Sequence, residues 1–260
     1  PSVPILKAKA NLNPPPFTYA PDLHIPARKA DQSFVGYLWT TGRSYISFYK
    51  AGISHVRQTA QLAKKLRARV GSNPATEVLT RAEWQVVRRS KSDMIRLPGF
   101  GLLVLVLGEW LPLVVLYITP IIPEPCRIPQ QVQRAQEKAQ RRRMERLRDV
   151  SRRGMSLQAQ ERRVAGAQTQ DSLYELLLKS ARFGCHSPVW DTLGLTPPKW
   201  LLRRNVGKVL EYVRMDDGLI ERDGGWAALE RREVERALVE RGVDVLGKKE
   251  EDMRREIVEW

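Results

Sequence analysis

Basic side chains that could bind phosphate are concentrated in the middle of the chain. From Arg127 to Arg163 there are 12 basic and 4 acidic residues, and residues 130–150, QQVQRAQEKAQRRRMERLRDV, are polar and helix-prone. Guanidinium groups bind phosphate oxygens through paired N–H donors. A helix this polar is also typical of a solvated face or of a spoke between domains, so both interpretations stay open. The candidate RNA contacts are Arg134, Lys138, Arg141, Arg142, Arg143, Arg146, Arg152 and Arg153.

Two acidic residues could handle protons or cations. Glu109 is the single charged residue between Leu97 and Ile122, and Asp93 shortly precedes this segment. A carboxyl group in hydrocarbon is costly, and such groups often mark ion or proton pathways. A protonated or hydrogen-bonded Glu109 beside a kink at Pro112 is the structural alternative. One membrane span cannot enclose a pathway, so ion exchange would require an oligomer.

The sequence does not predict an enzyme, a cofactor or a metal site. Cys126 and Cys185 are far apart and lack CxxC spacing, which excludes a disulfide scaffold and disfavours zinc. The adjacent Cys185 and His186 offer no nucleophile–base spacing, so we expect them to pack. No Walker loop or catalytic triad is visible in the sequence.

The net charge favours a polyanionic partner. The chain has 44 Lys and Arg against 29 Asp and Glu, a formal charge of +15. Residues 197–260 hold 14 basic and 15 acidic residues, so the whole surplus precedes them. Nucleic acid and an anionic membrane surface both fit this charge. No aromatic residue lies among the arginines of residues 127–163, so sequence-specific reading of single-stranded RNA is not indicated.

A long apolar segment precedes the arginines. Leu97–Ile122 is 26 residues long, and 16 of them are Leu, Ile, Val or Phe. These contribute on the order of −5 to −10 kcal/mol toward insertion, against about 3 kcal/mol for the one charge. We predict a transmembrane helix over residues 94–123, with a buried hairpin of a water-soluble protein as the alternative. Five Lys or Arg lie in the twenty residues on each side, so charge does not fix the orientation.

The remaining elements are predicted to be helical, apart from the start. Seven prolines in residues 1–33 predict an extended arm. Aromatic and apolar residues at helical spacing predict an amphipathic helix over residues 34–70, lying in a membrane interface or in a soluble core. Thr80 and Glu83 form a capping box that starts the next helix. Further helices are expected over residues 173–180, 199–215, 227–240 and 249–260, and the sequence Asp-Asp-Gly at 216–218 is expected to end the second of these.

Two blocks of residues resemble the Letm family of mitochondrial inner-membrane proteins. The first block contains LTRAE at 79–83, Asp93 before Ile95-Arg96-Leu97, the apolar segment, and Glu109 with Leu111-Pro112. The second contains DDGLI at 216–220, Gly224, Leu229, Glu233, Ala237, Arg241-Gly242, Gly247 and Trp260. The resemblance extends over most of residues 34–260, but the chain has no EF-hand loop and no heptad-repeat tail.

The resemblance implies an all-α, single-pass protein of the mitochondrial inner membrane. Its domains would be the arm at 1–33, juxtamembrane helices at 34–93, the transmembrane helix at 94–123, and the basic helix with a 14-3-3-like ribosome-binding domain at 124–260, in the matrix. It would bind the mitochondrial ribosome through RNA and ribosomal proteins and support insertion of mitochondrially translated proteins. Inner-membrane lipids, a second copy of the chain or the insertion machinery are the other implied partners.

Two further functions are weighed against this one. The family is also linked to potassium/proton or calcium/proton exchange, for which Asp93 and Glu109 would be the site. The last two helices are reminiscent of small helix-extension-helix DNA-binding units, but the net charge of −1 over residues 197–260 argues against phosphate binding there.

Overall fold

The chain is all-helical, as predicted. The computed structural model describes residues 5–28, 31, 33–107, 121–165 and 172–260, with side chains left out at 107 and 155–165. The described residues form helices, turns and loops and contain no strand. Contacts divide the chain into two compact units, residues 1–135 and 136–260, and each is described by itself.

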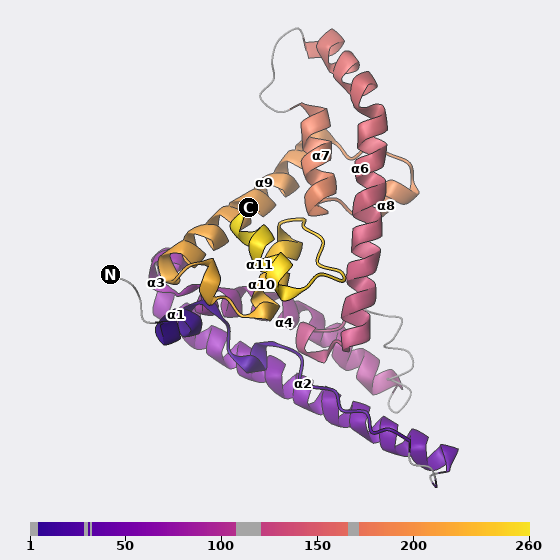
Figure 1. The fold of residues 1–260 in the computed structure, drawn as a ribbon, viewed down its shortest axis with the longest axis vertical. Helices are drawn as coiled ribbons and strands as arrows, with labels where there is room; N and C mark the ends of the chain where they lie inside the picture. The colour runs from indigo at the N-terminus through magenta and orange to yellow at the C-terminus, as the bar shows by residue number, and fades with distance from the viewer. Residues whose placement is uncertain (1–4, 29–30, 32, 108–120, 166–171) are drawn as a thin grey trace. The chain divides into compact units, whose positions relative to one another are not determined.

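Two long helices form the first unit. α2, Phe34–Val70, and α4, Arg81–Leu107, run antiparallel and are joined by the short helix α3, Ala75–Val78 (Figure 1). The Arg69 side chain near the end of α2 pairs with Glu83 near the start of α4. Further along the pair, the rings of Tyr49 and Phe100 lie 6.2 Å apart. The predicted helix over residues 34–70 is therefore confirmed with its bounds.

The predicted capping box starts α4. The Thr80 hydroxyl accepts a hydrogen bond from the Glu83 amide at 3.4 Å, and the Thr80 amide donates to the Glu83 carboxylate at 3.1 Å. Both bonds satisfy backbone donors that a helix start otherwise leaves unpaired. From this cap, α4 continues through Pro98 into the apolar segment.

The N-terminal arm is not extended throughout, which differs from the prediction. It contains the helix α1, Ile5–Leu12, and the 3-10 turn η1, Pro16–Thr18. Residues 5–12 are free of proline and rich in Ala and Leu, so a short helix is allowed between the prolines. The buried Arg81 donates to the Leu12 carbonyl at 2.9 Å, and a ring nitrogen of His55 lies 2.9 Å from the Tyr19 carbonyl oxygen. These bonds fix the arm along α4 and α2.

The two ends of the apolar segment lie next to each other. A Cβ placed on Gly99 would be 3.0 Å from the Ile121 side chain, and Phe100 and Ile122 share one buried cluster. A straight helix over residues 97–122 would separate its ends by about 37 Å. The described residues therefore do not support the predicted single transmembrane helix. None of the described helices has an apolar run long enough to cross a bilayer. The central residues 108–120, including Glu109 and Pro112, lie outside the described residues.

The second unit contains most of α6 and all of the later helices. α6 spans Pro129–Ala165, and it is followed by α7, Leu173–Phe183, α8, Pro188–Thr192, and α9, Lys199–Asp223. The 3-10 turn η4, Trp226–Ala228, and the helices α10, Arg231–Glu240, and α11, Glu250–Val258, complete it. Val150 of α6 packs in a core with Leu176 and Leu177 of α7 and Leu202 of α9.

α9 does not end at residues 216–218, where the sequence predicted its end. It continues for two more turns to Asp223 and ends at Gly224. The reason is Arg241, which is fully buried, bonds to the carboxylates of Asp216 and Asp217, and lies 5.0 Å from the centre of the Trp226 ring. With this partner, the two aspartates are tolerated inside the helix. The predicted helix over residues 227–240 is also divided, into η4 and α10.

Candidate nucleic-acid interface

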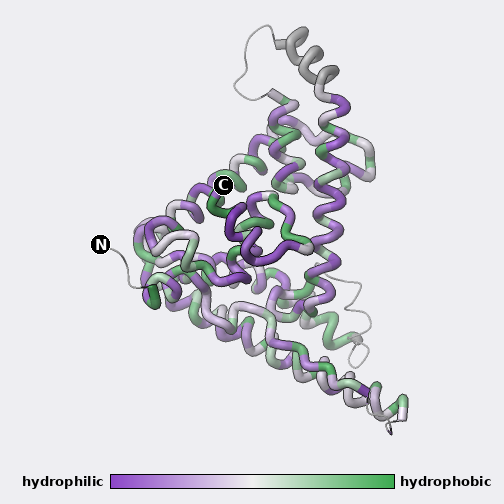
Figure 2. Tube along the Cα trace, viewed as in Figure 1, coloured by the Kyte–Doolittle hydropathy of each residue, from purple (hydrophilic) through white to green (hydrophobic). Residues whose placement is uncertain are grey.

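One face of α6 presents an exposed row of cations, which we call the α6 basic stripe. It consists of Lys138, Arg141, Arg148 and Arg152, all exposed, and Glu145 is the one acidic residue at the same spacing. Steps of three and four residues place these side chains on one side of a helix. The stripe is about 21 Å long at 1.5 Å per residue. Figure 2 shows that α6 is strongly hydrophilic over this stretch.

The stripe is available to an external anion. Within the part of the chain that the structure describes, no carboxylate forms an ion pair with any of its four cations. The neighbouring Arg153 differs, because its guanidinium is 3.0 Å from the Asp149 carboxylate on the same helix. An exposed pair of this kind is worth about 0–1 kcal/mol and can open to take another anion.

Arg146 is not part of the exposed surface, although the sequence suggested it as an RNA contact. Its side chain is only 9% exposed and forms two hydrogen bonds from Nε to the Asp191 carboxylate, at 3.1 and 3.0 Å. Burial alone would raise the pKa of Asp191, but the bonds and charge of Arg146 lower it below its usual range. This pair links α6 to α8 and is a structural contact.

The Arg146–Asp191 pair continues into a small polar network. Nε2 of His186 is 3.3 Å from Asp191, and Nδ1 of His186 is 2.7 Å from the Ser180 hydroxyl. Serine, histidine and aspartate are the groups of a hydrolytic triad. Ser180 is completely buried, however, and Arg146 occupies the carboxylate. A substrate could not reach this serine, so the network serves to hold α6, α7 and α8 together.

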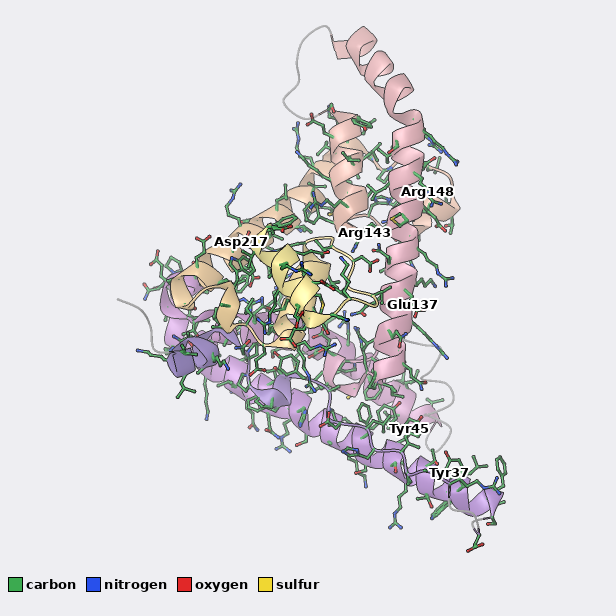
Figure 3. The ribbon with its side chains drawn as sticks, viewed as in Figure 1. Tyr37, Tyr45, Glu137, Arg143, Arg148 and Asp217 are labelled. Atoms are coloured by element: carbon green, nitrogen blue, oxygen red, sulfur yellow. The ribbon has the colours of Figure 1, made fainter. Side chains whose placement is uncertain are left out.

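The other suggested contacts have different environments. Arg143 is partly buried and its Nη1 donates to the Gln140 side chain at 2.8 Å. Burial lowers the pKa of Arg143, and the nearby Asp244 carboxylate partly opposes this effect. Arg142 is also partly buried, whereas Arg134, in the part of α6 that belongs to the first unit, is exposed. Arg143 and Arg148 are labelled on different sides of α6 in Figure 3.

Sequence reasoning missed Arg148, which belongs to the stripe. The spacing from Lys138 through Arg141 to Arg148 and Arg152 is the sequence signal that places these cations on one helical face. Conversely, nothing in the sequence near Arg146 shows that its partner lies 45 residues later.

The acidic pair suggested for ion exchange is not brought together in the described residues. Asp93 is 2% exposed and accepts a hydrogen bond from the Glu124 amide at 2.9 Å. Burial raises the pKa of this carboxyl, the Glu124 amide opposes the shift, and the Glu124 charge adds to it. Glu109 lies outside the described residues. Among the described residues, no group of three or more His, Cys, Asp or Glu could hold a metal ion.

The first half of α2 exposes apolar and aromatic side chains, as an interfacial helix does. Trp39 is 68% exposed, and Phe34, Val35 and Leu38 are also exposed. Tyr37 and Tyr45, labelled in Figure 3, lie on the same stretch of α2 and are half-buried. Tyr49, one turn further on, is buried against Phe48 and Phe100. The aromatic residues of this helix are thus divided between core and surface.

No protein-family model, no curated protein and no solved structure matches this chain.

Proposed function

We propose that this chain is a membrane-anchored binding protein of the Letm type that tethers the mitochondrial ribosome to the inner membrane. The resemblance in residues 79–112 and 216–260 supports the family, and the location in the inner membrane with the second unit in the matrix follows from it. In this role the chain would hold ribosomes near the site where newly made membrane proteins are inserted and assembled.

The observation that carries the proposal is the α6 basic stripe. Its four cations are exposed and, within the described residues, form no ion pair, so an anion can bind them without breaking an internal contact. The resemblance to the Letm family makes ribosomal RNA the polyanion that we propose for this row. Arg153 would join the stripe when its exposed pair with Asp149 opens.

The stripe supports contacts with phosphate and gives no basis for reading bases. A nucleic-acid duplex carries one phosphate charge per ~1.7 Å of its axis, so about 21 Å of helix faces roughly a dozen phosphates. Four cations can neutralise at most four of them. We therefore expect binding that depends strongly on salt and weakly on RNA sequence.

The membrane anchor in this proposal is the apolar segment of residues 97–122. Its insertion is favoured by on the order of 5 to 10 kcal/mol from its Leu, Ile, Val and Phe residues. The exposed aromatic side chains of α2 would lie at the level of the lipid headgroups, where such rings are enriched. Because α6 begins at Pro129, soon after this segment, the stripe would stay close to the membrane.

A binding titration with neutralised variants tests the tether. Arg141, Arg148 and Arg152 are changed together to Gln, and sedimentation with purified mitochondrial ribosomes is measured at several salt concentrations. The matched control removes three exposed cations of α9, Arg204, Lys208 and Arg214. The stripe variant should lower the slope of log K against log salt by about 2–3, and the control should change it little. Equal slopes for the two variants would contradict the proposal.

Ion exchange is the second function implied by the family, and no observation of the described residues favours it. The Asp93 carboxylate is engaged with the Glu124 amide. Glu109, its suggested partner, lies outside the described residues. The tether is therefore the function we propose.

A further inference from the structure

The apolar segment leaves the first unit and returns to it at the same place. Ile121 reaches the backbone of Gly99, and Ile122 packs with Phe100, Phe48 and Tyr49 in one buried cluster. The residues before the segment and those after it are thus neighbours, whatever path residues 108–120 take between them.

Several contacts hold the returning chain. The Glu124 amide donates to the buried Asp93 carboxylate at 2.9 Å. The 3-10 turn η3, Glu124–Cys126, lies so close to α2 that a Cβ on Gly52 would be 2.7 Å from the Pro125 carbonyl oxygen. Cys126 and Ile128 are fully buried in the same cluster as Phe100. The junction is therefore a packed part of the first unit.

Several exposed apolar side chains of the first unit extend from this junction. On α4, beyond Phe100, Leu102, Leu105 and Val106 are exposed, Leu105 to 82%. Because α2 runs antiparallel to α4, its exposed Phe34, Leu38 and Trp39 belong to the same end of the helix pair.

The charge of α2 fits the surface of an anionic membrane. No acidic residue occurs in Phe34–Val70, whereas Arg43, Lys50 and Arg57 are exposed and follow the aromatic stretch. Aromatic rings at the headgroup level, followed by cations, are the arrangement that an interfacial helix presents to anionic lipid.

We infer that this end of the first unit enters an anionic bilayer and that the chain leaves through the same face by which it entered. The N-terminal arm and α6 then lie on one side of the membrane. The inference rests on the membrane anchor of the proposed function and is independent of ribosome binding. It replaces the predicted single-pass topology with a one-sided one.

The number of maleimide tags that each protein molecule acquires tests this topology. Ala68 on α2 and Ala135 on α6 are exposed and lie before and after the apolar segment. Both are changed to Cys in the full chain, with Cys126 and Cys185 changed to Ala. The protein is reconstituted into sealed vesicles of phosphatidylcholine and phosphatidylglycerol and treated with a membrane-impermeant polyethylene-glycol maleimide. Gel shifts then show how many tags each molecule carries.

A one-sided chain gives molecules with no tag or with two tags, in any mixture of orientations. A single-pass chain gives molecules with one tag and would overturn the inference. The matched control is the pair Ala27→Cys and Ala68→Cys, both exposed and both before the segment, which gives no tag or two in either topology. A parallel series that keeps the buried Cys126 shows whether its replacement disturbs the fold.

Flotation of the same vesicles completes the test. The chain should float with vesicles that contain phosphatidylglycerol and should bind less to phosphatidylcholine alone. A chain that stays at the bottom of the gradient with both lipids would also overturn the inference. Neither measurement includes ribosomes, so failure of the tether would leave the topology result unchanged.

Discussion

The Asp93 carboxylate accepts a hydrogen bond from the Glu124 amide at 2.9 Å, across 31 residues of chain. This bond fixes the point at which the apolar segment rejoins the helix pair α2 and α4. An acidic side chain that the sequence associates with ion transport is in this position a structural contact between the two ends of the segment.

Substitutions of Asp93 should separate its hydrogen bond from its charge. Asp93→Ala removes the acceptor of the Glu124 amide and should lower the free energy of unfolding by about 1–3 kcal/mol. Asp93→Asn keeps an acceptor oxygen and removes a buried charge, so it should cost less. Denaturant unfolding of both variants in detergent measures the difference. Equal losses of unfolding free energy in the two variants would show that the hydrogen bond to the Glu124 amide does not stabilise this junction.

The raised pKa of Asp93 predicts that the free energy of unfolding depends on pH. Because burial raises the pKa of Asp93 above its value of 3.8 in an unfolded chain, the folded state binds this proton more tightly. The contribution of Asp93 to stability is then fully present below the unfolded pKa and is lost as the pH rises through the folded pKa. Because Asp93→Asn cannot titrate, the free energy of unfolding of wild type minus that of Asp93→Asn should therefore increase as the pH is lowered toward 4. A difference that does not vary with pH would contradict this environment.

Gly52 and Gly42 of α2 offer a matched pair of Gly→Ala substitutions. A Cβ at Gly52 would lie 2.7 Å from the Pro125 carbonyl oxygen and 2.9 Å from Cys126 Sγ, whereas one at Gly42 meets nothing within 4 Å. Gly52→Ala should destabilise the first unit by about 1–3 kcal/mol through overpacking. Gly42→Ala should stabilise it by about 0.5–1 kcal/mol, because alanine is the better helix former. Thermal unfolding measures the stability of the two variants. If both were stabilised, the close contact of Gly52 with Pro125 would be contradicted.

The network of Arg146, Asp191 and His186 predicts that acid weakens the second unit. Although burial acts to raise the pKa of Asp191, the bonds from Arg146 lower it, and burial together with Arg146 lowers the pKa of His186. Both groups therefore contribute stability above their unfolded pKa values, and they lose it as the pH falls through the folded ones. Unfolding measured between pH 7 and pH 3 should show this loss in wild type and a smaller loss in the double variant Asp191→Asn, His186→Gln. A loss of the same size in both would argue against the network.

Arg241 should matter far more than an exposed arginine of the same unit. It is fully buried with Asp216, and its removal takes away the buried cation that pairs with this carboxylate. Such a change costs about 3–5 kcal/mol. Arg255→Ala is the control, because the ion pair of Arg255 with Asp252 is exposed and should contribute at most about 1 kcal/mol. Denaturation of the second unit can be monitored by circular dichroism. Equal losses of unfolding free energy for the two substitutions would contradict the structural role given to Arg241.

Local sequence signals predicted much of the fold. The capping box at Thr80 and Glu83 fixed the start of α4, and apolar periodicity fixed α2 with its bounds. Features that depend on distant partners were missed. The end of α9 depends on Arg241, and the burial of Arg146 depends on Asp191 in α8. The meeting of Gly99 with Ile121 depends on tertiary packing, which hydropathy does not report.

Recruitment of ribosomes to vesicles tests the proposed tether most directly. Sealed vesicles carrying the full chain are mixed with purified mitochondrial ribosomes and floated through a gradient at low and high salt. Ribosomes should float with these vesicles at low salt, less at high salt, and much less when Arg141, Arg148 and Arg152 are changed to Gln. Vesicles carrying the Arg204, Lys208 and Arg214 variant should recruit them almost as well as wild type. Ribosomes that float equally with bare vesicles, or equally with the stripe variant, would contradict the account.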